Sequence, residues 1–258
     1  MRAVAVHRDA LVVTSLLWRL NAVVLRSGEE ALLVDSPYFP EELEALPAML
    51  AQAGFQVDAL LATHADFDHV LGRLAFPELA LGVGEPTAER LRAEPGLAQR
   101  ELRAEDDVHY VRRPAPLRLG AWEALPVPGY VGLGVAELQL HPADGHTADG
   151  TAVWAPEHGV LACGDYLSDV EIPMISPGGS LPAYRMTLAR LAPLVEHSGA
   201  VVPGHGGPHD RDAALRVLDE DLAYLDALER GEERPRLPPG RDNARQRAIH
   251  GENLAESV

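Results

Sequence analysis

The sequence predicts a single domain of mixed α and β structure in which helices cover β-sheets. Three observations support this. Apolar runs typical of strands alternate with amphipathic stretches typical of helices in both halves of the 258 residues. We find no internal repeat and no linker long enough to separate two domains. Four turns carrying His or Asp also follow, or nearly follow, strand-like runs, and such turns can gather metal ligands at the edge of a sheet.

In the first half, apolar runs bounded by turn residues predict strands. The expected strands are 11–18, 22–26, 31–35, 58–62 and 79–83. A helix is expected at 40–53, because Pro40 is favourable in a first turn and Gly54 is favourable just past a helix end. The charged, Arg-rich stretch 85–113 is expected to be helical in part.

In the second half, the Pro and Gly residues between 114 and 135 predict loops and short strands. Further strands are expected at 137–140, 151–154, 159–162 and 200–202, and helices at 180–197 and 210–230. These elements assign residues 1–230 to the main domain. Residues 231–258 are expected to form a Pro-rich connector and a C-terminal tail packed on or near it.

Composition and charge argue against several classes of protein, including nucleic-acid-binding and membrane proteins. The apolar fraction of 47% and charged fraction of 24% are ordinary for a globular protein. The net charge of −17 argues against a nucleic-acid surface, which needs basic patches. No apolar run is long enough to span a bilayer, and charges near the N-terminus argue against a signal peptide, so we expect a cytoplasmic protein without membrane contact. Cys163, the one cysteine, excludes an internal disulfide and any Cys-based zinc site.

A run of potential metal ligands follows the expected strand 58–62, and three later turns add more. The full set of candidates is His64, Asp66, Asp68, His69, His146, Asp165 and His205. Imidazoles and carboxylates together suit Zn, Fe or Mn, and this set suffices for two divalent ions with one bridging carboxylate. Two such ions would share a bridging water, lower its pKa toward neutrality and polarise a carbonyl or phosphoryl oxygen, so no serine or cysteine nucleophile is required.

The order of these motifs resembles the metallo-β-lactamase superfamily, whose pattern is an early Asp after a strand, then His-x-His-x-Asp-His, then single His, Asp and His residues. In motif order the resemblance runs from about Val23 to His205, and Asp35 is the early Asp of the pattern. The resemblance implies an α+β fold, a four-layer αββα sandwich. It also implies that His64, residue 66 and His146 bind metal 1, and that Asp68, His69 and His205 bind metal 2. Asp165 would bridge the two ions, and Asp35 would hydrogen-bond a ligand or loop behind them.

One position departs from the family pattern, because Asp66 replaces the second His of the motif. A carboxylate is a harder ligand and adds one negative charge at metal 1. Two divalent ions, three carboxylates and one hydroxide carry no net charge, whereas the usual His would leave plus one. We therefore expect weaker Lewis acidity and either a shift from Zn toward Fe or Mn or a weakly filled metal 1 site.

The expected function is a metal-dependent hydrolase that uses a metal-bridging hydroxide on an ester, thioester, lactone or similar bond of a small molecule. Asp68 and Asp165 are the expected catalytic carboxylates, and two divalent ions, with Zn favoured over Fe or Mn, are the expected cofactors. Three alternatives remain open: a small-molecule phosphodiesterase, a non-haem iron oxidoreductase such as a sulfur dioxygenase, and a catalytically silent metal-binding regulatory protein. A homodimer is one open oligomeric state.

An apolar pocket is expected beside the metals, because a Pro-bounded apolar run follows Asp165 closely. Tyr166, Ile172 and Met174 are the candidate pocket residues, although simple packing explains Ile172 and Met174 equally well and is the favoured interpretation of Tyr166. His250, in the C-terminal tail, is open to three interpretations: it folds back over the site, contacts a second subunit, or lies on the surface.

Overall fold

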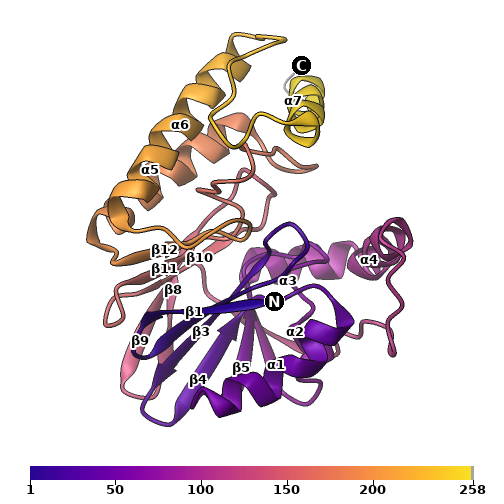
Figure 1. Cartoon of the computed structure of the whole chain (residues 1–258), viewed down its shortest axis with the longest axis vertical. Coiled ribbons are helices and arrows are strands. Elements are labelled where there is room, and N and C mark those ends of the chain that lie inside the picture. The colour runs from indigo at the N-terminus through magenta and orange to yellow at the C-terminus, as the bar shows by residue number, and fades with distance from the viewer. Residues whose placement is uncertain (257–258) are drawn as a thin grey trace.

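The computed structural model describes residues 1–256. A seven-stranded sheet forms the N-terminal half of the fold (Figure 1). Its strands, in spatial order, are β1 (Arg2–His7), β2 (Ala10–Thr14), β3 (Asn21–Ser27), β4 (Glu30–Val34), β5 (Val57–Ala62), β6 (Ala80–Gly84) and β7 (Trp122–Leu125). The strands pair antiparallel from β1 to β4 and parallel from β4 to β7. The ends of β4 and β5 therefore meet at the same edge.

A five-stranded sheet faces the first. Its spatial order is β12 (Ala200–Val202), β11 (Val160–Ala162), β10 (Thr151–Ala155), β9 (Ala136–Pro142) and β8 (Gly129–Leu133). Only β11 and β12 pair in parallel. Apolar side chains from both sheets form one core between them, including Val12 and Leu25 from the first sheet and Leu138 and Val153 from the second. This burial removes apolar surface from water and holds the sheets face to face.

Helices cover the two outer faces of this sandwich (Figure 1). The first sheet is covered by α1 (Pro40–Gln52), α2 (Gly72–Ala75), α3 (Glu85–Ala93) and α4 (Leu97–Val108), and the second by α5 (Leu181–His197) and α6 (Arg211–Glu229). Helix α7 (Ala244–Glu256) packs beside α6. The predicted αββα order in a single domain is confirmed. Among the described residues, no helix combines the length and the apolar character that crossing a membrane requires.

Four elements differ from the sequence-based expectations, and one of them is the four-residue helix α2, which was not predicted. The strand expected at 11–18 ends at Thr14, because the chain turns through Trp18 and Arg19, which have positive φ angles of 50° and 53°. The edge strand β1 was not predicted, although four of its six residues are Ala or Val, and all six are at least partly exposed in the structure. The C-terminal tail, for which no helix was predicted, contains α7, whose buried face is largely polar and therefore lacks helical hydrophobic periodicity.

Candidate metal centre

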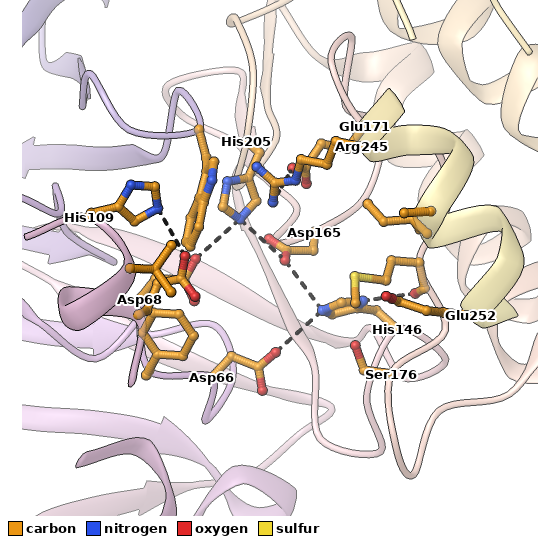
Figure 2. Close-up of a pocket in the computed structure, with 17 residues that line it drawn as sticks. Asp66, Asp68, His109, His146, Asp165, Glu171, Ser176, His205, Arg245 and Glu252 are labelled. Atoms are coloured by element: carbon orange, nitrogen blue, oxygen red, sulfur yellow. Dashed lines mark hydrogen bonds and ion pairs between the residues drawn. The ribbon is translucent and has the colours of Figure 1, made fainter. Parts of the chain in front are cut away.

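The seven candidate ligands converge at one edge of the sandwich. Residues 64–69 follow β5, His146 lies in the loop after β9, Asp165 follows β11 and His205 follows β12. Figure 2 shows Asp66, Asp68, His146, Asp165 and His205 directed toward one another. Four separate loops thus supply one constellation because the strands that carry them end at the same edge.

Two groups of three ligands that share no residue form within this constellation, and a third group, His64, His69 and Asp165, links them. The first group is His64, Asp66 and His146, and the second is Asp68, His69 and His205. Within each group, one ligand atom from every residue lies within 4.8 Å of the others. In the first group, Asp66 Oδ2 is 3.6 Å from His64 Nε2 and 3.5 Å from His146 Nε2. In the second, Asp68 Oδ2 is 3.4 Å from His205 Nε2. These are the two groups that the resemblance implied.

Asp165 lies between the two groups. Its Oδ1 is 3.1 Å from His69 Nε2, and its Oδ2 is 3.3 Å from His146 Nε2 and 3.5 Å from His205 Nε2. The two oxygens of the Asp165 carboxylate therefore face ligands of both groups. This is the placement that a bridging carboxylate requires.

The imidazoles are oriented by contacts on their other ring nitrogen. His69 Nδ1 is 2.9 Å from Asp35 Oδ2, His146 Nδ1 is 2.8 Å from the Met174 carbonyl oxygen, and His64 Nδ1 is 3.0 Å from the Thr63 hydroxyl oxygen. The Nε2 atoms of these three histidines are buried and have no hydrogen-bond partner within residues 1–256. Buried polar groups normally have partners. Three convergent, unsatisfied Nε2 atoms beside carboxylates fit divalent metal ions.

The electrostatics of the cluster also favour cations. Burial alone would lower the pKa of His146, but Asp66 and Asp165 outweigh it and raise that pKa to about 9. Burial alone would raise the pKa of Asp165, yet the neighbouring His69 and His205 hold it well below its usual value. The carboxylates are therefore ionised at neutral pH. Protons on the imidazoles must leave when a metal binds, so metal affinity should fall as the pH falls.

Arg90, on α3, was missed by the sequence analysis. Its Nη1 atom lies 2.8 Å from Asp66 Oδ1 and 2.7 Å from Asp149 Oδ1. Burial alone would lower the pKa of Arg90, but the nearby carboxylates, Asp66 foremost, raise it. The sequence showed an Arg-rich stretch at 85–113 but held no local signal that would single out one arginine, because the contact is made across the fold.

The comparisons with known proteins agree with this geometry. A family model described as the metallo-beta-lactamase superfamily matches residues 18–208. The chain belongs to the metallo-β-lactamase superfamily. Similar solved structures include the DIM-1 metallo-β-lactamase, with 19% identity and a TM-score of 0.63 over 86% of this chain and 97% of that one. The search of curated proteins found no match.

Two further solved structures show the same fold. A metallo-β-lactamase from Pontibacter korlensis has 19% identity and a TM-score of 0.62, covering 84% of this chain and 97% of that one. A metallo-β-lactamase family protein from Thermus thermophilus has 21% identity and a TM-score of 0.67, covering 88% of this chain and 83% of that one. At these identities the likeness establishes the fold shared with these proteins.

In this metallo-β-lactamase-fold protein, a cavity of about 510 Å³ opens beside the ligands (Figure 2). Its walls come from the loop after β2, from α4, from the segment after Asp165 and from α7. The lining side chains outside the ligand set are Trp18, Phe67, Glu105, Val108, His109, Glu171, Met174, Ser176, Arg245, Ala248, Ile249 and Glu252. Helix α7 lies beyond residues 18–208, the region that the family model matches, so the family match does not cover this part of the wall.

Of the three residues expected in the pocket, Met174 lines the cavity, while Tyr166 and Ile172 are buried behind it. The Tyr166 hydroxyl donates to the Asp144 carbonyl and accepts from the His146 backbone N–H, at 2.8 and 2.9 Å, so it holds the His146 loop. His250 is neither over the site nor on the surface. It is buried, with its ring nitrogens 3.0 Å from the Tyr224 hydroxyl and 2.8 Å from the Glu232 carbonyl oxygen.

Proposed function

We propose that this protein is a metal-dependent hydrolase that cleaves an ester, thioester or lactone bond in an uncharged small molecule. The observation that carries the proposal is the convergence of two groups of metal ligands, with Asp165 between them, on a cavity large enough for a small substrate. The superfamily match supports metal-dependent hydrolysis as the reaction class.

The residues present would hold two ions as follows: His64, Asp66 and His146 around one, Asp68, His69 and His205 around the other, and Asp165 toward both. When bound, divalent ions supply a water molecule of lowered pKa and polarise the substrate carbonyl. Asp35 and the Met174 carbonyl fix the rings of His69 and His146, which keeps their Nε2 atoms directed at the ions.

Cys163 does not serve as a competing nucleophile. Its side chain is fully buried on the strand side of the centre, with Sγ 3.3 Å from the Val202 carbonyl oxygen. Burial raises the pKa of the thiol, which keeps it protonated at neutral pH. The attack is therefore assigned to water.

The cavity walls favour an uncharged substrate. Apolar side chains such as Trp18, Met174 and Ile249 line it together with Glu105 and other carboxylates. Among the described residues that line it, Arg245 is the sole Lys or Arg, and its Nη2 atom is 3.1 Å from Glu171 Oε1. A cation already paired with a carboxylate offers little attraction to an anionic phosphodiester, while the apolar walls suit an apolar acyl group.

A substrate panel tests the proposal. Protein loaded with Zn, Fe or Mn is assayed on neutral chromogenic esters, thioesters and lactones and on phosphodiesters of similar size. We expect faster cleavage of the neutral esters and lactones, and loss of that activity in His205→Ala with the fold retained. Faster cleavage of the phosphodiesters would contradict the proposal in favour of a phosphodiesterase, and equal activity in His205→Ala would contradict the metal-centred mechanism.

A non-haem iron oxidoreductase is the second candidate, because three carboxylates in the ligand set provide harder ligands that suit Fe. Oxygen consumption by the iron-loaded protein in the presence of a persulfide, without hydrolysis of any panel substrate, would favour this candidate over the hydrolase.

A further inference from the structure

We infer that Arg90 is a positioning residue for the metal 1 ligand Asp66, and that it is the partner that allows a carboxylate to stand where the superfamily motif has a histidine. The inference rests on the proposed metal centre but not on any particular substrate. It concerns a residue on α3, outside the motif loops, that the ligand pattern does not contain.

The two oxygens of Asp66 point to different partners. Oδ2 faces the Nε2 atoms of His64 and His146 at 3.6 and 3.5 Å, whereas Oδ1 lies 2.8 Å from Arg90 Nη1. The ion pair with Arg90 therefore selects which oxygen is directed at metal 1 and restricts Asp66 to a single donor atom. A histidine offers one donor nitrogen from the same position, so this restriction makes the carboxylate resemble the ligand that it replaces.

Arg90 is itself held in place. Its Nη1 atom is 2.7 Å from Asp149 Oδ1, and its Nε atom is 3.1 Å from Glu94 Oε2. Asp149 is only 1% exposed, and its second oxygen accepts a 2.8 Å hydrogen bond from the Ala65 backbone N–H, directly before Asp66. The Thr87 hydroxyl, one turn earlier on α3, donates to the Asp149 carbonyl at 2.7 Å. Helix α3, Asp149 and the ligand loop thus form one connected unit.

The charge of Arg90 also acts on the centre. Its side chain is 18% exposed and that of Asp66 is 22% exposed, so solvent screens this pair less than a surface pair. A carboxylate that shares its charge with a guanidinium donates less negative charge to a metal. Because Arg90 is shared with Asp149, the compensation is partial. Metal 1 should therefore be a stronger Lewis acid than a charge count without Arg90 predicts.

A purely structural role is the competing explanation, since Arg90 also ties α3 to Asp149. The two roles differ in their dependence on Asp66. If Arg90 positions a carboxylate ligand, its removal should weaken metal binding when residue 66 is Asp and should change metal binding little when residue 66 is His. If Arg90 only supports the fold, its removal should have the same effect in both backgrounds. A double-mutant cycle between positions 90 and 66 separates these cases.

The experiment titrates the full chain, stripped of metal, with Zn²⁺ and Co²⁺ in competition with a chromophoric chelator. We expect Arg90→Met to weaken one of two sites about 10- to 100-fold and to change its Co²⁺ absorption bands, with the other site unchanged, because losing the fixed orientation of Asp66 outweighs the removal of a nearby positive charge. Arg90→Lys should recover part of the loss, because it keeps the charge without the planar fork. In the Asp66→His background, adding Arg90→Met should lower the metal affinity by less than about 3-fold. Arg92→Met, at an exposed arginine of the same helix, serves as the matched control.

Equal losses in the wild-type and Asp66→His backgrounds, or unchanged affinity in Arg90→Met, would overturn the inference. If Arg90→Met does not fold, Arg90→Lys and its combination with Asp66→His carry the same comparison. Because titration needs no substrate, a chain that binds two ions but hydrolyses no panel substrate contradicts the proposed function and leaves the role of Arg90 standing. A wild-type chain that binds no divalent ion contradicts both.

Discussion

Asp35 illustrates at the level of one residue how the protein prepares its ligands. It follows β4 in a left-handed conformation with φ of 57°, which Asp tolerates better than most residues. Its Oδ1 accepts the Thr63 backbone N–H at 2.8 Å, and its Oδ2 lies 2.9 Å from His69 Nδ1. One buried carboxylate therefore positions the start of the ligand loop and sets the tautomer of a candidate ligand.

Asp35→Asn tests this role with little change in size. The amide would present either an oxygen or an NH₂ group to His69, and the latter disfavours the tautomer whose Nε2 is free for metal. We expect the affinity for one of two ions to fall about 10- to 100-fold while the circular dichroism spectrum is retained. Chelator competition measures this, with the exposed Asp107→Asn as control. Unchanged affinity would show that the contact with His69 does not govern metal binding.

Helix α7 supports the site at the level of a whole element. The Gln246 side chain accepts from the Ile172 N–H at 2.7 Å, and Asn253 accepts from the Ile175 N–H at 2.8 Å. Asn253 also donates to the Pro173 carbonyl at 2.7 Å. These bonds fix the segment whose Met174 carbonyl contacts His146 Nδ1. The helix thus reaches the metal centre through one intervening stretch of backbone.

Asn253→Ala should therefore affect both stability and the centre. It leaves the buried Ile175 N–H and Pro173 carbonyl without their side-chain partner, which we expect to lower the free energy of unfolding by about 1–3 kcal/mol. Metal affinity at the His146 site should fall in the same variant, because the Met174 carbonyl is less well held. Denaturant unfolding and metal titration measure the two effects, with the exposed Glu256→Ala as control. Stability and affinity equal to wild type would contradict this role of α7.

The elements differ in how far local sequence could predict them. Strands β3, β4 and β5 and helix α1 were predicted within one or two residues because apolar runs and the Pro40 and Gly54 signals mark them. Helix α7 was missed because Gln246, His250 and Asn253 fill its buried face with polar side chains that bond across the fold. Hydrophobic periodicity detects burial against apolar partners and is silent about buried hydrogen-bond networks.

The arrangement of strands and helices in the whole molecule explains why the sequence predicted the ligands more readily than the cavity walls. The ligand residues follow strand ends, and the sandwich brings those ends to one edge, so motif order alone indicated their proximity. The cavity walls depend on how α4 and α7 lie over that edge, which no local pattern specifies. The same limit applies to Arg90, whose contact with Asp66 joins α3 to the ligand loop and alters the charge expected from the motif.

Metal stoichiometry tests the central claim most directly. The full chain is saturated with Zn²⁺, freed of unbound ion and analysed by mass spectrometry for metal per protein. The two ligand groups around Asp165 predict two ions per chain, and one ion per chain after Asp66→Ala removes a ligand from the first group. One ion or fewer in the wild-type chain, or two ions retained by a His64→Ala, His205→Ala double variant, would contradict the assignment of this cluster as a binuclear metal centre.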